Sequence, residues 1–468
     1  MRSYINSILS RRGMYTIFGV LFITIGTFIA IQYANGNLRL TEDGVVQGTG
    51  LLAANSFPPG AEVLVNDKLV TATDDTIYLE PGEYTVQIRK DGYAPWSKNL
   101  RVEQELVTQT NAKLFPSAPS LSPLTFTGVQ NLHPSPDGQK VVYYTASASA
   151  ERKNGLYVLE LNSGSTLSFQ RGPRQISFDS ENFDLETADF IWSPDSSELI
   201  VMSNDREVLL NVSTTNDLDT LTDISFQRKQ ILSAWEQEMY IRERQFLAEF
   251  PVEILKIAAS SAKNLYISPD KKRLLYTATQ AATIPDTIVP PIPATNTQPE
   301  ERQLVAGGIY VYDREEDKNF RVASEASDAT GSPSGTLNLE LNLLEGAQKK
   351  LLALDILDER SQLLTASASA FEALQATDSA QTAKNFNTYH SSLYANTVQW
   401  FPDSKHIIFL QDRTIKVMEY DASNKTTIYA GPFIDQFVYP WPDGSRLLIK
   451  TAFSPDSPTN LYAIELNQ

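Results

Sequence analysis

A Pro-Asp turn with similar surroundings occurs five times in this chain of 468 residues, and this repeat constrains the fold more than any other feature. The turns lie at Pro136-Asp137, Pro194-Asp195, Pro269-Asp270, Pro402-Asp403 and Pro442-Asp443. Each is followed by three residues and then by a short apolar run typical of a strand. Proline at the second position of a type I turn predicts a hairpin here. Because one hairpin unit cannot bury both of its faces, five units predict sheets that stack around an axis.

Several copies continue into a further strand of shared form, at 155–161, 308–313 and 460–466. The whole pattern resembles the repeat of TolB-like β-propellers, which implies a propeller at 117–468. The aspartates are 58, 75, 133 and 40 residues apart, whereas a bare blade takes ~40–45 residues. The longest gap therefore predicts a blade without the turn motif, with its later strands at Lys350 to Thr365. We predict about six blades, with seven as the alternative.

The chain ends within the last repeat, on a segment that aligns with the third strand of a four-stranded blade. Without an outer strand, this blade would keep an unpaired edge. The beginning of the propeller offers the missing strand, so we predict that residues near 124–128 pair antiparallel with residues near 461–466.

Two insertions interrupt the repeat. At 228–250 a helical stripe of Ile231, Trp235, Met239, Phe246 and Phe250 ends before Pro251. We expect this helix to pack on its own propeller rather than to recruit a partner, although its role stays open. The role of the insertion at 366–395 also stays open, and the Pro- and Thr-rich stretch 284–299 predicts an exposed loop.

The N-terminus predicts a membrane anchor. Residues from Met14 to Ala34 carry no charge, and such a helix is long enough to span a hydrocarbon core of ~30 Å. Arg11 and Arg12 precede it, which predicts a cytoplasmic tail at 1–13 and an extracytoplasmic bulk. The predicted location is thus the cell membrane, with a single pass and a stalk at 35–44. A cleaved signal peptide is the alternative, but the run is long for one and lacks a good cleavage site.

Residues 45–116 predict a separate small β-domain. In the clearest strand, Tyr84, Val86 and Ile88 alternate with polar residues, and turns at Pro81-Gly82 and Asp91-Gly92 flank it. These stretches, together with 59–66, resemble the PEGA domain, although Pro59 replaces the glutamate of the motif. The resemblance implies a small β-sandwich of exported, surface-associated proteins.

Two aromatic residues of this domain are candidate ligand contacts. Tyr93 and Trp96 follow the Asp-Gly turn and would suit a sugar-stacking platform. The alternative, which we favour, is that both cover the open end of a small core.

The residue inventory offers no chemistry that predicts an enzyme. The chain lacks cysteine, and no metalloprotease, nucleophile-elbow or phosphate-loop motif occurs. Of the three histidines, His133 and His406 neighbour Pro-Asp turns and His390 stands apart. The repeated aspartates lack the alternating carboxylates of a calcium loop, so a turn role is favoured. We predict no catalytic, cofactor or metal residue.

Together these observations predict a mainly β protein with an N-terminal transmembrane helix, a PEGA-like sandwich and a propeller. A net charge of −17 argues against nucleic acid as a partner. The leading hypothesis is a membrane-anchored binding or scaffolding protein whose propeller contacts another protein. The alternative is a protein that binds cell wall or glycan through the PEGA-like domain.

Overall fold

The computed structural model describes residues 11–34, 38–40, 46–161, 172–203, 206–292, 296–324, 398–434, 437–454 and 457–467. The chain divides into two compact units, and each is described by itself. The first contains Met1–Leu114 and Ile292–Gln298, and the second contains the rest. The division at Leu114 lies close to the boundary that we predicted after residue 116.

The first unit begins with one long apolar helix, α2 (Arg11–Ala34). Its stretch Met14–Ile31 has a mean hydropathy of 2.1, and none of it is buried. By length and composition this helix is able to cross a membrane. The predicted apolar helix is therefore confirmed. Its length and composition fit a retained membrane anchor and a signal peptide equally.

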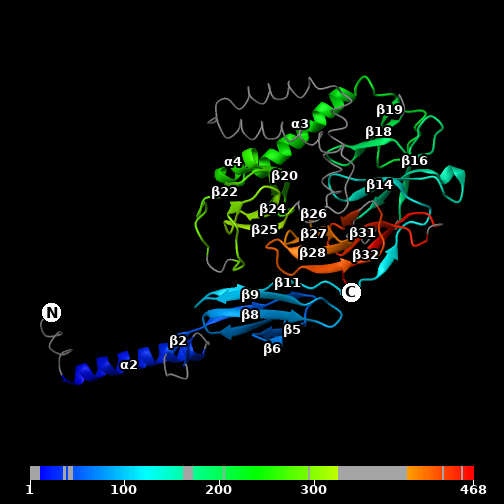
Figure 1. The fold of residues 1–468 in the computed structure, drawn as a ribbon. Helices are drawn as coiled ribbons and strands as arrows, with labels where there is room; N and C mark the ends of the chain where they lie inside the picture. The colour runs from blue at the N-terminus through cyan, green and yellow to red at the C-terminus, as the bar shows by residue number, and fades with distance from the viewer. Residues whose placement is uncertain are drawn as a thin grey trace, which may run out of the picture. The chain divides into compact units, whose positions relative to one another are not determined.

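The β-domain of the first unit contains two sheets (Figure 1). One sheet has the order β10-β3-β7 and comprises β3 (Gly50–Ala54), β7 (Asp75–Leu79) and β10 (Val107–Gln109). The other has the order β6-β5-β8-β9 and comprises β5 (Glu62–Val65), β6 (Lys68–Ala72), β8 (Gly82–Arg89) and β9 (Trp96–Val102). Two short pairs complete it: β1 (Leu38–Leu40) with β2 (Val46–Gly48), and β4 (Ser56–Phe57) with β11 (Ala112–Lys113).

The core of this domain lies between the inward faces of the two sheets. Val86 and Ile88 are fully buried in it and pack with Leu52 and Val63. Tyr84, on the same face of β8, is half-buried and donates its hydroxyl hydrogen to the Glu80 carbonyl oxygen at 2.9 Å. The predicted inward face of β8 is therefore confirmed.

The second unit contains five sheets of blade type among the described residues. The first is β13 (Gln130–Pro134), β14 (Lys140–Thr145), β15 (Gly155–Glu160) and β16 (Arg174–Phe178). The second is β17 (Asp189–Trp192), β18 (Glu198–Ser203) and β19 (Arg206–Asn211). The third is β20 (Ala262–Ile267), β21 (Arg273–Ala278), β24 (Gly308–Asp313) and β25 (Lys318–Ser324).

The fourth sheet is β26 (Val398–Trp400), β27 (His406–Gln411), β28 (Thr414–Glu419) and β29 (Thr426–Tyr429). The fifth is β30 (Val438–Pro440), β31 (Arg446–Thr451), β32 (Asn460–Glu465) and β12 (Leu121–Pro123). We call these sheets blades 1 to 5. Short accessory elements are η1 (Glu151–Lys153) and the pair β22 (Ala282–Thr283) and β23 (Gln303–Leu304).

The blades pack face to face in the order 2-1-5-4-3. Four apolar clusters join neighbouring blades, and each cluster combines residues from two of them. Blades 3 and 4 pack directly against each other, so no further blade stands between them. The segment Lys350–Thr365, in which we predicted a sixth blade, lies outside the described residues.

The first strand of the propeller completes its last blade. In β12, Leu121 pairs with Ile464 and Pro123 with Tyr462 in antiparallel register. The contact continues beyond the strand, where the Leu124 amide donates to the Leu461 carbonyl oxygen at 2.9 Å. The predicted closure is confirmed, with the paired strand three residues nearer the N-terminus than expected.

Two helices, α3 (Arg228–Leu247) and α4 (Val252–Ser261), connect blade 2 to blade 3 (Figure 1). The sequence predicted α3 and its end before Pro251. It did not predict α4, for which Pro251 is the N-cap residue. The described residues of the stretch 284–299 are mostly exposed, as expected. Its first residue, Ile284, is buried. The insertion at 366–395 lies outside the described part of the chain.

Candidate interaction surface: blade seams and a helical junction

The five Pro-Asp turns have the same backbone geometry. In each, the residue before proline accepts a hydrogen bond from the amide of the residue after aspartate, at 2.8–3.0 Å. The residue after aspartate has a positive φ in all five copies, from 58° to 75°. Glycine occupies this position twice, at Gly138 and Gly444, where a left-handed conformation carries no Cβ penalty. The turns thus confirm the predicted hairpins.

The aspartates of these turns are engaged by their own backbone. Each carboxylate accepts a hydrogen bond from the amide two residues later, at 2.9–3.1 Å. In the first three copies the preceding serine also donates its hydroxyl hydrogen to the carboxylate, as Ser135 does to Asp137. These bonds within each turn explain why Ser, Pro and Asp recur at the same spacing in the first three copies of the repeat.

Blades 1 and 2 are joined by three hydrogen bonds between their turns. Trp192 Nε1 donates to the His133 carbonyl oxygen at 3.3 Å, and the Asp137 amide donates to Ser196 Oγ at 3.2 Å. Lys140 Nζ donates to the Ser196 carbonyl oxygen at 2.8 Å. Ser196 is the residue with positive φ in the second turn, so this residue receives two of the three bonds.

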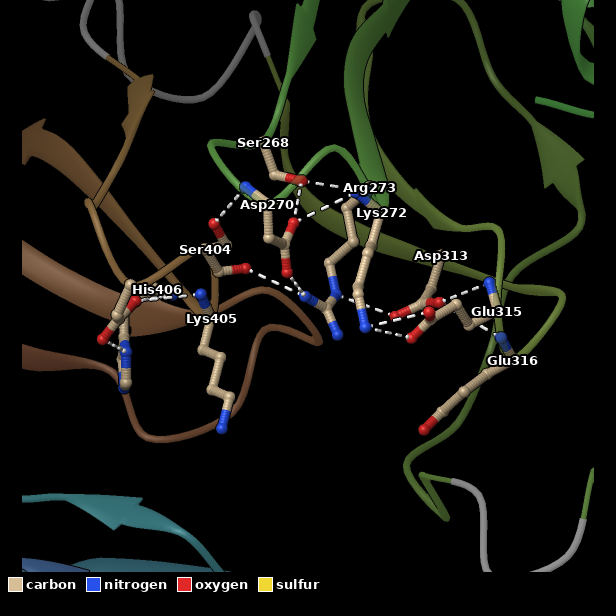
Figure 2. Close-up of polar contacts among 11 residues, drawn as sticks. Ser268, Asp270, Lys272, Arg273, Asp313, Glu315, Glu316, Ser404, Lys405 and His406 are labelled. Carbon is tan, nitrogen blue, oxygen red and sulfur yellow. Dashed lines mark hydrogen bonds and ion pairs between the residues drawn. The ribbon is translucent and has the colours of Figure 1, made fainter. Parts of the chain in front are cut away.

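Blades 3 and 4 repeat these bonds at equivalent positions, and Figure 2 shows the two that Ser404 accepts. Trp400 Nε1 donates to the Tyr266 carbonyl oxygen at 3.0 Å, and the Asp270 amide donates to Ser404 Oγ at 2.9 Å. Arg273 Nη1 donates to the Ser404 carbonyl oxygen at 3.1 Å. We call this set of three bonds a hydrogen-bonded seam.

Arg273 of the second seam also forms a buried ion pair within blade 3. Its Nε lies 2.8 Å from Asp313 Oδ2, and the Asp313 side chain is almost fully buried. Its Nη1 lies 3.3 Å from Asp270 Oδ2, and the guanidinium lies 4.0 Å from the centre of the Tyr420 ring. Burial alone would lower the pKa of Arg273, but the charge of Asp313, assisted by Tyr420 and Asp270, raises it above its usual value. The group therefore stays cationic and holds two blades together.

Blade 2 and blade 3 form no such seam among the described residues. The position of Lys140 and Arg273 is occupied in blade 2 by Glu198, whose carboxylate cannot donate to a carbonyl oxygen. The residue with positive φ in blade 3 is Lys271 rather than serine. Its Nζ lies 3.9 Å from the centre of the Phe246 ring in α3. A helix therefore takes the place of the neighbouring blade.

The two helices cover the remaining faces of these blades. Leu232 and Trp235 of α3 are buried against Ile191 and Ile200 of blade 2. Phe250, just before α4, and Ile254 of α4 are buried against blade 3. The face of blade 3 that they contact is rich in tyrosine and contains Tyr276, Tyr310 and Tyr312. The expectation that the helix packs on its own propeller is confirmed for these residues.

An ion pair lies at each end of α3. Arg228 pairs with Glu207 of blade 2, and both side chains are mostly buried. Burial, opposed by Arg228, raises the pKa of Glu207. At the other end, Arg314 of blade 3 lies 2.6 Å from Glu249. The segment is thus attached to both blades.

Large apolar side chains remain exposed along the segment. Phe226, just before α3, is fully exposed, and Ile241 and Val252 are each about half exposed. These three exposed side chains are the candidate contact residues of the second unit.

The two described histidines have structural positions. His406 is buried, and its Nδ1 lies 2.8 Å from Asp403 Oδ2 of its own turn. His133 is partly buried, with Nε2 3.0 Å from Asn131 Oδ1 and its ring edge-on to Phe190 of blade 2. Burial lowers the pKa of His133 to about 4. His390 lies outside the described residues.

The structure separates the two candidate ligand contacts of the β-domain. Trp96 is only 2% exposed and lies in the core with Val86 and Ile88, so its ring offers no face for stacking. Tyr93 is half-buried and packs against the same core. The burial of Trp96 agrees with the interpretation that we favoured, in which its ring belongs to a small core.

Within the described ranges, no group of three or more His, Asp or Glu side chains is placed to hold a metal ion. We assign no catalytic, cofactor or metal role to any residue there.

The seams and the helical junction were not predicted from the sequence. A signal for the seams is present: tryptophan precedes Ser-Pro-Asp-Ser at Trp192 and Phe-Pro-Asp-Ser at Trp400, in the two blades whose tryptophan donates and whose serine accepts the seam bonds. The other three turns lack this combination of tryptophan and serine. The partner positions of Lys140 and Arg273 become visible only when the blades are placed side by side.

A family model matches the β-domain of the first unit. Residues 49–118 match the family model described as PEGA domain. No curated protein matches the chain.

Solved structures similar to the chain include two TolB proteins and one lyase. A protein assigned as TolB from Agrobacterium tumefaciens is 12% identical, with 72% of this chain and 77% of that chain covered and a TM-score of 0.21. TolB from Acinetobacter baumannii is 11% identical, with 82% and 60% covered and a TM-score of 0.20. Oligogalacturonate lyase from Vibrio parahaemolyticus is 9% identical, with 82% and 86% covered and a TM-score of 0.23.

At these identities and TM-scores, the likenesses assign neither a function nor a partner. The chain spans less than two thirds of the Acinetobacter protein. The match to the family model and the two-sheet sandwich agree with the resemblance noted in the sequence, and residues 49–118 form a PEGA domain.

Proposed function

We propose that this chain is a membrane-anchored, extracytoplasmic binding or scaffolding protein whose propeller binds another protein. The observation that carries the proposal is the apolar helix α2, unburied along Met14–Ile31, which leads directly into a PEGA domain. Arg11 and Arg12 before the helix favour a cytoplasmic N-terminus. The large units then lie outside the cytoplasm.

Binding rather than catalysis is supported by the use of the polar groups in the second unit. The aspartates of the repeated turns, Arg273 and the two described histidines are engaged in turns and seams. The proposed partner contact is the exposed apolar set along the helical segment, Phe226, Ile241 and Val252. The glycan-binding alternative loses its main stacking residue, because Trp96 is buried.

The anchor is tested on intact cells and on purified membranes. We expect added protease to degrade the two units and the purified protein to retain Met14 to Ala34. A mature N-terminus near residue 35 would show that α2 is a cleaved signal and would contradict the anchor.

The partner contact is tested by a photo-crosslinking amino acid at Ile241 of the full chain in its native membrane. The matched control places the same group at Ser213, which is exposed in blade 2. We expect a protein adduct from position 241 and none from position 213. Adducts from both positions or from neither would contradict the assignment of the helical segment as the contact.

A further inference from the structure

The two outward faces of the PEGA domain differ sharply in charge. On the β10-β3-β7 sheet, Val107, Leu51 and Tyr78 lie in one row across the three strands. The next row on the same face is Gln109, Ala53 and Thr76. None of these six side chains is charged, in a chain whose net charge is −17. We call these six residues the uncharged face.

The uncharged face is accessible and partly apolar. Val107 is 45% exposed and Tyr78 is 36% exposed, whereas Leu52, from the opposite side of the same strand as Leu51, is fully buried in the core. An exposed row of large apolar side chains on a small sandwich is a candidate contact surface.

The opposite outward face has ordinary surface chemistry. On the β6-β5-β8-β9 sheet, Glu62 lies beside Arg89 and Glu83 lies beside Arg101. All four side chains are exposed. Such a face favours water, so the two faces of the domain suit different surroundings.

The chain holds the uncharged face close to the end of α2. Ala34 ends the helix, and Leu38, four residues later, pairs with Gly48 of β2. Leu51 follows Gly48 by three residues, so an extended chain places it within about 30 Å of the helix end. The pairing of β1 with β2 shortens this connection, which keeps the domain near whatever surface the helix enters.

We propose that the uncharged face rests on the phospholipid surface of the membrane in which α2 is anchored. This inference rests on the proposed function, because it requires the anchor to be retained. A neutral face avoids repulsion by anionic lipid, and tyrosine is a side chain suited to the boundary between headgroups and acyl chains. The charged face then points to the aqueous side and the domain acts as a fixed base rather than as a swinging spacer.

The absence of cysteine allows a direct test with single-cysteine variants. Thr76→Cys places a fluorophore on the uncharged face, and Ser97→Cys places it on the charged face as the matched control. Both positions are exposed, so neither substitution disturbs the core. Ile25→Cys in α2 reports insertion of the anchor. The full chain is reconstituted in phosphatidylcholine–phosphatidylglycerol vesicles that contain nitroxide-labelled lipid.

We expect strong quenching at position 25, and quenching at position 76 that exceeds that at position 97 by at least about twofold. A second variant, Tyr78→Glu with Val107→Glu in the Thr76→Cys background, should remove this excess. Quenching at position 25 with equal values at 76 and 97 would overturn the inference and leave the anchor intact. Absence of quenching at position 25 would overturn the anchor itself, and the inference with it.

Discussion

Two junctions of the propeller solve the same packing problem in different ways. Blades 3 and 4 meet through three hydrogen bonds, one of them from Arg273, whose guanidinium is held by Asp313 of its own blade. Blades 2 and 3 are neighbours in sequence, yet their facing sides are covered by α3 and α4. The first junction joins turn to turn, and the second joins sheet to helix.

The hydrogen bonds of a seam depend on two positions in the repeat. A seam needs a basic side chain at the start of the second strand and serine at the residue with positive φ in the next blade. Lys140 with Ser196 and Arg273 with Ser404 meet this condition. Glu198 with Lys271 does not, because a carboxylate has no proton to donate and an ammonium group offers no acceptor. The bonding pair is absent where α3 and α4 cover the blades, but its absence alone does not separate two blades, because blade 5 packs directly against blades 4 and 1 without it.

The largest expected effect comes from removing the strand that completes blade 5. Deletion of residues 120–128 removes β12 and its backbone bonds to β32, including the bond from Leu124 to Leu461. At about 1 kcal/mol for each of several hydrogen bonds, with lost burial added, the cost should exceed about 5 kcal/mol. Thermal unfolding of the purified protein checks this. Shortening the exposed 146–153 loop is the control, and an equal effect of the two deletions would contradict the closure.

The hydrogen-bonded junctions are distinguished by comparing Arg273→Ala with Lys140→Ala. The two side chains make the same bond to a serine carbonyl oxygen, but only Arg273 neutralises a buried carboxylate. Arg273→Ala should cost about 3–5 kcal/mol because Asp313 is left unpaired, and Lys140→Ala about 1 kcal/mol. Urea unfolding measures both. Equal costs would mean that the ion pair adds nothing to the seam.

The helical junction is tested by Trp235→Ala in α3. Trp235 is 9% exposed and fills the space between α3 and blade 2, so we expect a loss of about 3–5 kcal/mol. The exposed Ile241→Ala on the same helix is the control and should change the free energy of unfolding by less than about 0.5 kcal/mol. A small effect of Trp235→Ala would show that α3 is an attachment rather than a part of the core.

The sequence predicted the repeated hairpins, the closure and the inward face of β8, because each depends on local turn chemistry or on alternation. The sequence itself shows proline at a fixed turn position, and it shows that Val86 and Ile88, two residues apart in one strand, share a face. The seams and α4 were not predicted, because they depend on residues far apart in the chain, such as Arg273 and Ser404. Trp96 shows the same limit: its side of the strand decides between ligand contact and core, and the sequence left both open.

The two seams should also differ in their response to pH. The first contains His133, whose pKa is lowered by burial to about 4, and the second contains Tyr266 at the equivalent position. Since the unfolded histidine binds its proton near pH 6.5, the unfolded state holds more protons between pH 6.5 and 4. The contribution of His133 to stability is therefore complete above pH 6.5 and is lost as the pH falls to 4.

The loss should amount to at most about 3 kcal/mol, which is the shift converted at about 1.4 kcal/mol per pKa unit. Urea unfolding between pH 7 and pH 4 measures it, with His133→Gln as the comparison. The variant should show a shallower loss of stability over this interval. The same slope in both proteins would mean that another group, not the first seam, carries the pH dependence.

The smallest effect concerns the serine that accepts the seam bonds. Ser404→Ala removes the bond from the Asp270 amide but keeps a Cβ at a φ of 61°, so we expect a cost of about 1–2 kcal/mol. Ser404→Gly removes the same bond and also relieves the left-handed conformation, which should reduce the cost to about 0–1 kcal/mol. This substitution recreates the turns with Gly138 and Gly444, whose blades pack without the serine bond. If Ser404→Gly were as costly as Ser404→Ala, the hydroxyl group would be essential to the seam, and the sequence difference between the turns would reflect bonding alone rather than a balance with backbone strain.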